Sequence, residues 1–475
     1  MPAPSLDDAA RTVLSDARAA GVETVRISFV DQHGILRGKV LPLSALEGAF
    51  RNGVSMTSTL LLKDTSHRTV FPVWSDDAGF GDGVLTGAGD VIMRPDPTTF
   101  RVLPWSPHSA WMLADIEMAD GAPFPFSSRH LLRQAVNRLA ARDMALVTGL
   151  ELEFHVFRVT GPNLGHGDSG MPPAAPDTEL LAHGYQYLTE DRYDALEPVM
   201  DALRRAAEGL GLPVRSMEVE FGPGQFEFTF DPADALTHAD NMVLFRAMAK
   251  QVCRRQGLHA TFMTRPQVPN GMASGWHLHQ SLTDRASGRN LFMAGPDGEV
   301  SGIAGAWIAG LLAHAHATCL LSTPTVNGYK RYQNAFQLAP DRVAWGRDNK
   351  GTMLRALMRP DDPASRVENR VAEAAANPYL HMASQIAAGL DGIVRGLVAP
   401  DPVTTPYDTS APPLPRNLGE ALAAFEGDAF IDTAFGPGFR RYLSTIKRAE
   451  WDRFLATVTD WAQREYFPIF CAPIP

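Results

Sequence analysis

Ionisable residues alternate with apolar residues along several stretches of this chain, and this pattern limits its possible folds more than any other feature. The clearest case is Ser274-Gly-Trp-His-Leu-His-Gln-Ser281, which reads as a β-strand. Successive side chains of a strand point to opposite faces, so His277, His279 and Ser281 would share one face. A neutral imidazole is a common metal ligand. Two histidines alone do not decide between a metal site and a structural pair.

The same alternation recurs in three other stretches whose remaining residues suit a protein core. These stretches contain Glu151-Leu-Glu153, Glu218-Val-Glu220 followed by Glu227, and Arg366-Val-Glu368-Asn-Arg370. Burying several unpaired carboxylates is very costly. One such pair is usually a solvated strand face, whereas four strands of this kind together favour a shared cluster of cations. Carboxylate oxygens with a histidine suit Mg²⁺ or Mn²⁺ better than a thiol-binding metal.

Six short motifs, taken in order, resemble those of type I glutamine synthetases and their glutamate–amine ligase relatives. The motifs are Glu151-Leu-Glu153-Phe154, Glu220-Phe-Gly-Pro-Gly-Gln-Phe-Glu227, Ser274-Gly-Trp-His-Leu-His-Gln-Ser-Leu282, Asn327-Gly-Tyr-Lys-Arg331, Arg366-Val-Glu368-Asn-Arg370 and Ala376-Asn-Pro-Tyr379. Each motif alone is weak. Their shared order and spacing over nearly the whole chain make the resemblance specific.

The resemblance implies an α+β fold with two parts. Residues 1–110 are expected to form a small N-terminal β-grasp-like domain. Residues 111–475 are expected to form a large catalytic domain with a curved antiparallel sheet flanked by helices. A chain of 475 residues, with 45% hydrophobic and 20% charged residues, is long enough for both. Helical periodicity predicts helices over residues 193–210, 234–256 and 439–466.

The resemblance also assigns roles to the ionisable residues. It implies one metal held by Glu153, Glu220 and Glu227, and a second held by Glu151, His277 and Glu368. It implies that ATP faces His279, Ser281, Lys350, Arg355 and Arg366. It implies that glutamate is held by Arg331 and Arg370, with the backbone near Ala273 helping, and that Arg331, Arg355 and Arg370 are catalytic. A structural salt bridge remains the alternative for each arginine.

The likeness to ammonia-using enzymes fails at the amine site, where the family has acidic residues. Met56 or Thr57 stands near the place of an aspartate, and Phe336 or Gln337 near that of a glutamate. Trp276 replaces a methionine of the family motif. The loss of both acids removes the attraction for ammonium, and the apolar replacements indicate an apolar pocket. The alternative is that these substitutions arose by neutral drift in an enzyme that uses another amine.

The expected reaction is therefore the ATP-dependent ligation of L-glutamate to a primary amine through γ-glutamyl phosphate, as a step in amine catabolism. The favoured amine is an apolar alkyl or aryl amine, similar to isopropylamine or aniline. Two alternatives stay open, namely a glutamine synthetase that uses ammonia and a non-catalytic structural relative. The expected cofactors are ATP and Mg²⁺ or Mn²⁺.

Composition restricts the partners and the compartment. A net charge of −10 argues against a nucleic-acid partner. The three cysteines form no Cys-x-x-Cys motif, which suits a reducing cytoplasm and excludes a cysteine-based zinc site. No signal peptide is apparent, and the uncharged run 301–322 is expected to be a buried helix rather than a membrane span. The resemblance implies a homododecamer of two stacked hexameric rings.

Overall fold

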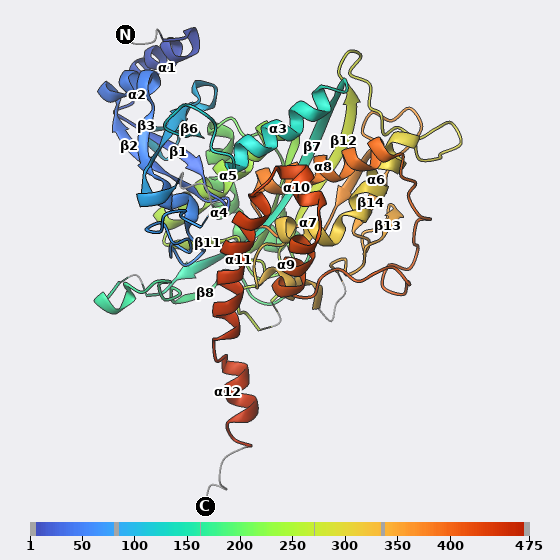
Figure 1. Cartoon of the computed structure of the whole chain (residues 1–475). Helices are drawn as coiled ribbons and strands as arrows, with labels where there is room; N and C mark the ends of the chain where they lie inside the picture. Colours follow the sequence, from blue (N-terminus) through green and yellow to red (C-terminus); the bar gives the residue numbers. More distant parts are fainter. Residues whose placement is uncertain (1–5, 80–84, 162, 270, 334–337, 470–475) are drawn as a thin grey trace, which may run out of the picture.

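The chain folds around two β-sheets, one in each half (Figure 1). The structure is a computed structural model, and it describes residues 6–79, 85–161, 163–269, 271–333 and 338–469. The first sheet has the strand order β2-β1-β6-β4-β3, with β5 paired to β6. Its strands are β1 (Thr24–Val30), β2 (Leu36–Pro42), β3 (Val54–Thr57), β4 (Asp90–Pro95), β5 (Arg101–Leu103) and β6 (Ser106–Glu117). The helices α1 (Asp8–Ala19) and α2 (Leu46–Asn52) belong to the same half.

The second sheet has the order β13-β14-β15-β12-β7-β10-β9, and β8 and β11 pair with β7. Its strands are β7 (Met144–Val159), β8 (Thr178–Leu180), β9 (Val214–Val219), β10 (Gln225–Asp234), β11 (Leu258–Thr261), β12 (Trp276–Asp284), β13 (Trp345–Arg347), β14 (Leu354–Leu357) and β15 (Arg366–Asn369). The pairs are antiparallel except for β13 and β14. The long apolar strand β7 lies at the centre and carries neighbours on both sides.

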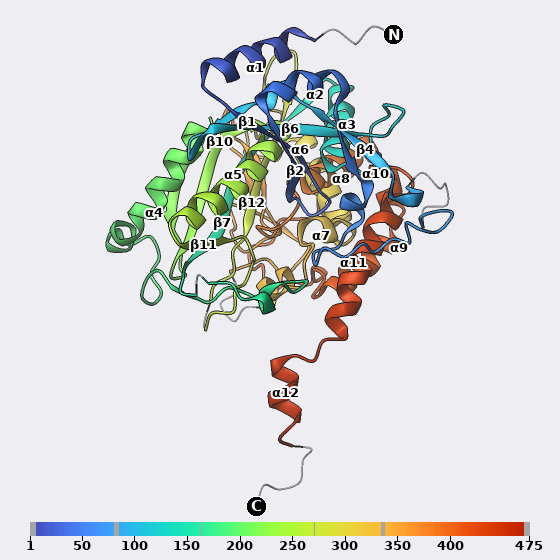
Figure 2. The same ribbon diagram turned by 90° about the vertical axis from the view of Figure 1, so that its left-hand side faces the viewer.

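Helices cover one face of this second sheet (Figure 2). The helices of this half are α3 (Ser128–Ala140), α4 (Glu190–Gly209), α5 (Ala235–Arg255), α6 (Gly302–Ala313), α7 (Ala315–Ser322), α8 (Pro378–Arg395), α9 (Leu418–Gly427), α10 (Phe430–Phe435), α11 (Phe439–Leu455) and α12 (Asp460–Tyr466), of which α12 extends away from the sheet. Phe154 of β7 meets Phe245 of α5 edge to face, with ring centroids 5.8 Å apart. Gln280 of β12 accepts a 3.2 Å hydrogen bond from the indole of Trp307 in α6. Alternate residues on these strands must therefore face away from the helices.

The α+β class is as expected, but the expected boundary near residue 110 falls inside a strand. β6 pairs in parallel with β1 and antiparallel with β4 as far as Glu117. The first sheet therefore ends at residue 117, and the second half starts with α3. The helix expected over residues 439–466 is instead two helices, α11 and α12, separated by residues 456–459.

A buried arginine joins the two halves. Arg129, at the start of α3, donates hydrogen bonds to Asp240 at 2.9 and 3.0 Å, to Asp115 at 3.0 Å and to Asp96 at 2.8 Å. Its side chain is only 5% exposed. Tyr379 of α8 donates a further 2.6 Å hydrogen bond to Asp240. The three carboxylates compensate the buried guanidinium and hold α3, α5 and α8 against the first sheet.

Among the described residues, no single helix is long and apolar enough to cross a membrane. The neighbours α6 and α7 pass such a test only together, and they are bent by 77° with respect to each other.

Candidate active site

The face of the second sheet that points away from the helices carries the ionisable residues. The strand registers place the following residues directly opposite each other: His277 and Glu151, Glu153 and Glu227, Glu227 and Glu218, His279 and Glu368, and Glu368 and Arg355. These pairs link β14, β15, β12, β7, β10 and β9, which are neighbours in this order across the sheet. The alternation seen in the sequence therefore produces one layer of charged groups, because every strand contributes the same face.

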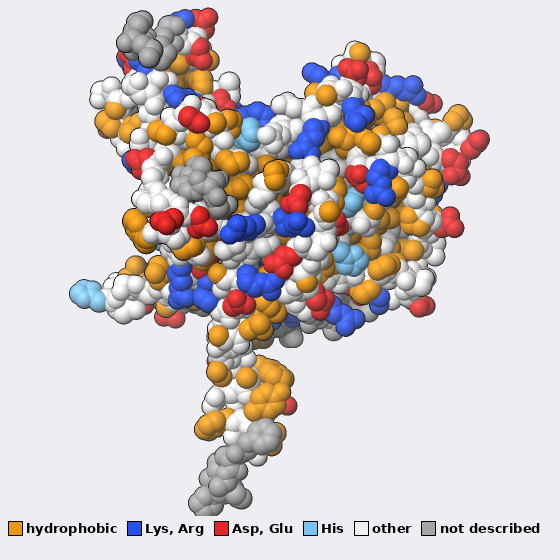
Figure 3. All heavy atoms as spheres, in the orientation of Figure 1, with side chains coloured by type: hydrophobic (Ala, Val, Ile, Leu, Met, Phe, Trp, Pro, Cys, Tyr) orange, Lys and Arg blue, Asp and Glu red, His pale blue; other side chains and the backbone are white. Residues whose placement is uncertain are grey.

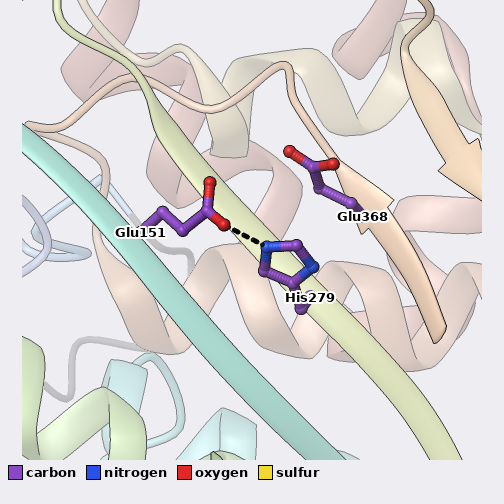
Figure 4. Close-up of side chains that lie close together, drawn as sticks. All are labelled: Glu151, His279 and Glu368. Atoms are coloured by element: carbon purple, nitrogen blue, oxygen red, sulfur yellow. Dashed lines mark hydrogen bonds and ion pairs between the residues drawn. The ribbon is translucent and has the colours of Figure 1, made fainter. Parts of the chain in front are cut away.

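Glu151 lies at the centre of this layer. Its carboxylate accepts hydrogen bonds from Nδ1 of His277 at 3.0 Å and from Nε2 of His279 at 2.8 Å. Figure 4 shows the second of these, with Glu368 on the far side of His279. Burial alone would raise the pKa of Glu151, but the hydrogen bonds from His277 and His279 outweigh it and hold that pKa well below its usual range.

His279 is fixed on its other side by an arginine. Nε of Arg366 donates a 3.0 Å hydrogen bond to Nδ1 of His279. Since that nitrogen accepts, the network assigns the proton of a neutral His279 to Nε2, which donates to Glu151. Ser281 is buried on the same face of β12. Lys350 is exposed in the turn between β13 and β14.

A second acidic group lies at the β9–β10 end of the layer. One oxygen from each of Glu218, Glu220 and Glu227 lies within 4.8 Å of the others. Burial, and then repulsion from Glu153, raises the pKa of Glu220 to about 8. The same two causes raise the pKa of Glu227 well above its usual range. Three carboxylates this close together are stabilised by a cation and destabilised without one.

Glu368 is paired with two arginines at the other end of the layer. Arg355 donates to it at 3.0 Å, and Arg370 donates to its other oxygen. Burial would raise the pKa of Glu368, but His277 and Arg370 lower it overall. Arg355 also bonds Asp348 at 2.9 Å. Arg355 therefore forms the structural salt bridge that is the alternative to its expected catalytic and ATP-facing role.

Arg331 is held rigidly beside the layer. It donates to the carbonyl oxygens of Arg370 at 2.9 Å and Val371 at 3.2 Å, and its Nη2 lies 3.5 Å from Nε2 of His277. A Cβ atom on Gly275 would lie 2.5 Å from Nη2 of Arg331, so the glycine leaves room for the guanidinium. Ala273, two residues earlier, is half-buried.

Arg370 has an unused donor in this region. Its side chain is buried, and among the described residues its Nε has no hydrogen-bond partner. A buried donor without a partner is costly unless a ligand supplies the acceptor. Arg370 therefore fits a role in binding an anionic substrate.

Two of the three residues expected to line the amine pocket lie elsewhere, which corrects that expectation. Trp276 is fully buried on the helix-covered face, where its ring meets His381 of α8 at 4.8 Å. It cannot share a pocket with His277, because adjacent strand residues point to opposite faces. Met56 is buried in the core of the first sheet, and its neighbour Thr57 is exposed instead. Phe336 lies outside the described residues.

An aromatic pair that the motifs did not reveal borders the acidic group. The rings of Tyr187 and Phe221 stack with centroids 4.3 Å apart and an interplanar angle of 3°. Burial, followed by the charges of Glu220, Glu218 and other carboxylates, raises the pKa of Tyr187 to about 12. Glu218, which belongs to an alternating pair, is a possible metal ligand that is not among the expected ones. The sequence around Tyr187 reads as a loop, so no periodic pattern indicates that its ring lies at the acidic group.

The donor set fits divalent cations that prefer oxygen ligands. Three groups of side chains bring possible ligand atoms within 4.8 Å of one another, namely Glu218 with Glu220 and Glu227, Glu151 with Glu227 and His277, and Glu151 with His279 and Glu368. Carboxylates with one imidazole suit Mg²⁺ or Mn²⁺. Glu153 lies in the same layer, where one of its oxygens accepts a 3.0 Å hydrogen bond from Gln225.

Comparison with known proteins identifies the family of the chain. Residues 125–466 match the model of the glutamine synthetase catalytic domain, and the chain belongs to that family. It is 41% identical to the γ-glutamylanilide synthase of Acinetobacter sp. over 97% of this chain and 96% of that protein. It is 33% identical to the γ-glutamylethanolamide synthetase GlnA4 of Streptomyces coelicolor over 94% and 93% of the two chains. The solved structure "Apo GmaS without ligand" has a TM-score of 0.80 and 31% identity, covering 96% of this chain and 99% of that one.

The raised pKa values predict how bound cations change stability with pH. Without a cation, the folded protein keeps protons that the unfolded chain loses near pH 4.5, because the pKa of Glu220 is about 8 and that of Glu227 is also raised. Their contribution to stability is full below the unfolded pKa and is lost as pH rises through the folded value. We expect the Tm of the metal-free protein to fall between about pH 5 and about pH 8.5. The increase in Tm on adding Mg²⁺ or Mn²⁺ should be larger at the higher pH.

The control is the double variant Glu220→Gln, Glu227→Gln, measured by scanning calorimetry with EDTA and with metal. It lacks both raised carboxyls, so its Tm should change less with pH and should respond less to metal. An equal metal-induced increase in Tm at both pH values would contradict this assignment.

Proposed function

We propose that this chain is an ATP-dependent glutamate–amine ligase that forms a γ-glutamylamide, ADP and phosphate. The observation that carries the proposal is the layer of carboxylates with Arg331 and Arg370 directly beside it. The relatives named for γ-glutamylanilide and γ-glutamylethanolamide synthesis support the same reaction class. An intact acidic layer disfavours the alternative of a non-catalytic relative, which has no need to keep these groups together.

The chemistry requires activation of a carboxylate, which is by itself a poor acyl donor. The γ-carboxylate of glutamate would attack the terminal phosphorus of ATP, giving γ-glutamyl phosphate and ADP. The amine nitrogen would then attack the acyl carbon, phosphate would leave, and the nitrogen would give up one proton to the released phosphate. Mg²⁺ or Mn²⁺ held by the carboxylates would neutralise phosphate charge.

The side chains of the layer divide this work. The free Nε of Arg370 and the anchored guanidinium of Arg331 would bind and orient glutamate. Arg366 and His279 would face the nucleotide, and the hydrogen bond between them fixes the orientation of the imidazole. Arg355 bridges Glu368 and Asp348, which supports a positioning role for it. Its hydrogen bond to Glu368 holds that carboxylate in position within the charged layer.

The amine that we propose is an apolar aryl or alkyl amine. The support is the stacked pair of Tyr187 and Phe221, which borders the acidic group, whereas Met56 and Trp276 lie elsewhere. Tyr187 is 43% exposed, so a second ring can reach it. Aromatic rings stack favourably on other rings. An aryl amine is neutral at working pH and needs no deprotonation before it attacks.

The test is phosphate release with ATP, Mg²⁺ and glutamate against ammonia, methylamine, isopropylamine, ethanolamine, putrescine and aniline. We expect the highest kcat/KM with aniline or isopropylamine and little activity with ammonia. Tyr187→Ala should raise the KM for aniline about tenfold while changing the KM for glutamate little. Tyr187→Phe keeps the ring and is the matched control, which should retain the affinity for aniline.

Other outcomes would revise the proposal in different ways. Highest activity with ammonia would indicate an ordinary glutamine synthetase. No activity with any amine, despite metal binding, would indicate a structural relative. An unchanged KM for aniline in Tyr187→Ala would remove the aromatic pair from the amine pocket but would leave the ligase reaction standing.

We further propose that the chain assembles into two stacked hexameric rings. The C-terminal helix α12 extends away from the body and exposes apolar side chains (Figure 3). Trp461 of α12, and Phe467 and Ile469 directly after it, are 58%, 68% and 67% exposed. Apolar surface of this kind is typical of an interaction site. Sedimentation velocity should give the mass of twelve chains, and a monomer at micromolar concentration would contradict the proposal.

A further inference from the structure

A large cavity lies away from the acidic layer, between the two halves of the chain. Its volume is about 880 Å³. One wall is the β1–β2 hairpin, and the opposite wall is the C-terminal part of α5 with β11 (Figure 2). Nη1 of Arg26 in β1 donates a 2.8 Å hydrogen bond to Gln251 of α5 and so ties the two walls together. A cavity of this size is large enough for a small organic ligand.

The lining of this cavity is strongly basic in a chain whose net charge is −10. Its cationic residues are Arg26, Arg37, Lys39, Arg246, Lys250, Arg254, Arg255 and Lys447. Among the described residues that line it, none is an aspartate or a glutamate. Positive charge is therefore concentrated on one concave surface, which raises the local concentration of anions.

Three of these cations are compensated by the protein itself. Arg37 pairs with Asp31 at 2.5 Å, and Lys447 pairs with Glu450 at 3.0 Å. Arg246 donates to three backbone carbonyl oxygens at 2.8 to 3.1 Å. These three residues are structural, and they do not need a ligand.

The remaining cations have no carboxylate within ion-pairing distance in the part of the chain that the structure describes. They are Arg26, Lys39, Lys250, Arg254 and Arg255. The dipole of α5 favours cations in its last turn, which accounts in part for Arg254 and Arg255. It does not account for the residues of the opposite wall. Lys250 lies over the ring of Phe262, with Nζ 5.7 Å from the centroid.

The cations of the cavity also repel one another. Burial, and then the charge of Arg246, lowers the pKa of Lys250 to about 8. Burial, and then Arg255, lowers the pKa of Arg26. Burial, followed by Lys250 and Arg254, lowers the pKa of His259. A bound anion would relieve this repulsion.

We infer that this cavity binds a small, multiply charged anion bearing phosphate or carboxylate groups, at a site separate from the ligase centre. Lys250, Arg254 and Arg255 would bind it from α5, and Lys39 and Arg26 from the hairpin. Charge-assisted hydrogen bonds from lysine and arginine are the usual means of holding such groups. Because the anion would contact both walls, it would also hold the two halves of the chain together.

The test is isothermal titration of the full-length protein, in EDTA and at low salt, with pyrophosphate and separately with citrate. EDTA keeps metal-dependent binding at the acidic layer out of the measurement. We expect one of the two anions to bind, with a dissociation constant that rises at least about tenfold in Lys250→Gln, Arg254→Gln. The Tm should rise with bound anion in the wild type and rise less in the variant.

Two controls locate the binding. Arg158→Gln, Arg215→Gln removes the same amount of charge at exposed positions and should bind as the wild type does. Arg366→Gln changes the expected nucleotide face and should also leave binding unchanged. Tighter binding of pyrophosphate would assign the site to phosphate esters, and tighter binding of citrate to polycarboxylates. Loss of binding in Arg366→Gln alone, or no binding of either anion at millimolar concentration, would overturn the inference.

Discussion

Repulsion between carboxylates on one sheet face is the constraint on which this structure depends. Glu218, Glu220 and Glu227 come within 4.8 Å of one another, and Glu153 lies opposite Glu227 in the strand register. Burial in this layer raises the pKa of Glu220 and of Glu227, which disfavours the charged forms of these two carboxyls. The helices on the other face compensate by packing rings such as Phe154 and Phe245 into a core. The sheet thus separates an apolar face that stabilises the fold from a charged face that needs ligands.

The residues of the charged layer could be predicted from sequence because strand periodicity is strict. Once Glu151 and His277 were assigned to strands, alternation fixed which neighbours shared their face. The same rule excludes Trp276 from the site, although it adjoins His277. Strand periodicity alone places Trp276 on the face opposite His277. Its place in the family motif, where other members have a methionine, instead indicates a position in the amine pocket. Position in a motif predicts the kind of residue better than the direction of its side chain.

Features made by long-range packing could not be predicted in this way. The stack of Tyr187 on Phe221 joins a loop to the end of β9, and no local pattern specifies that contact. The basic cavity likewise joins the β1–β2 hairpin to α5, which are more than two hundred residues apart in the sequence. The end of the first sheet at Glu117 depends on the pairing of β6 with β4. The residue at which a strand ends depends on the neighbouring strand that pairs with it, and that neighbour is determined by the tertiary structure.

If divalent cations neutralise the charged layer, the number of ions bound per chain can be counted directly. Titration of the metal-free protein with Mn²⁺, followed by the loss of the free-ion electron paramagnetic resonance signal, gives the number bound per chain. We expect two bound ions per chain, fewer in Glu227→Gln, and competition by Mg²⁺. Binding of no ion below millimolar Mn²⁺, or equal binding in Glu227→Gln, would contradict this expectation.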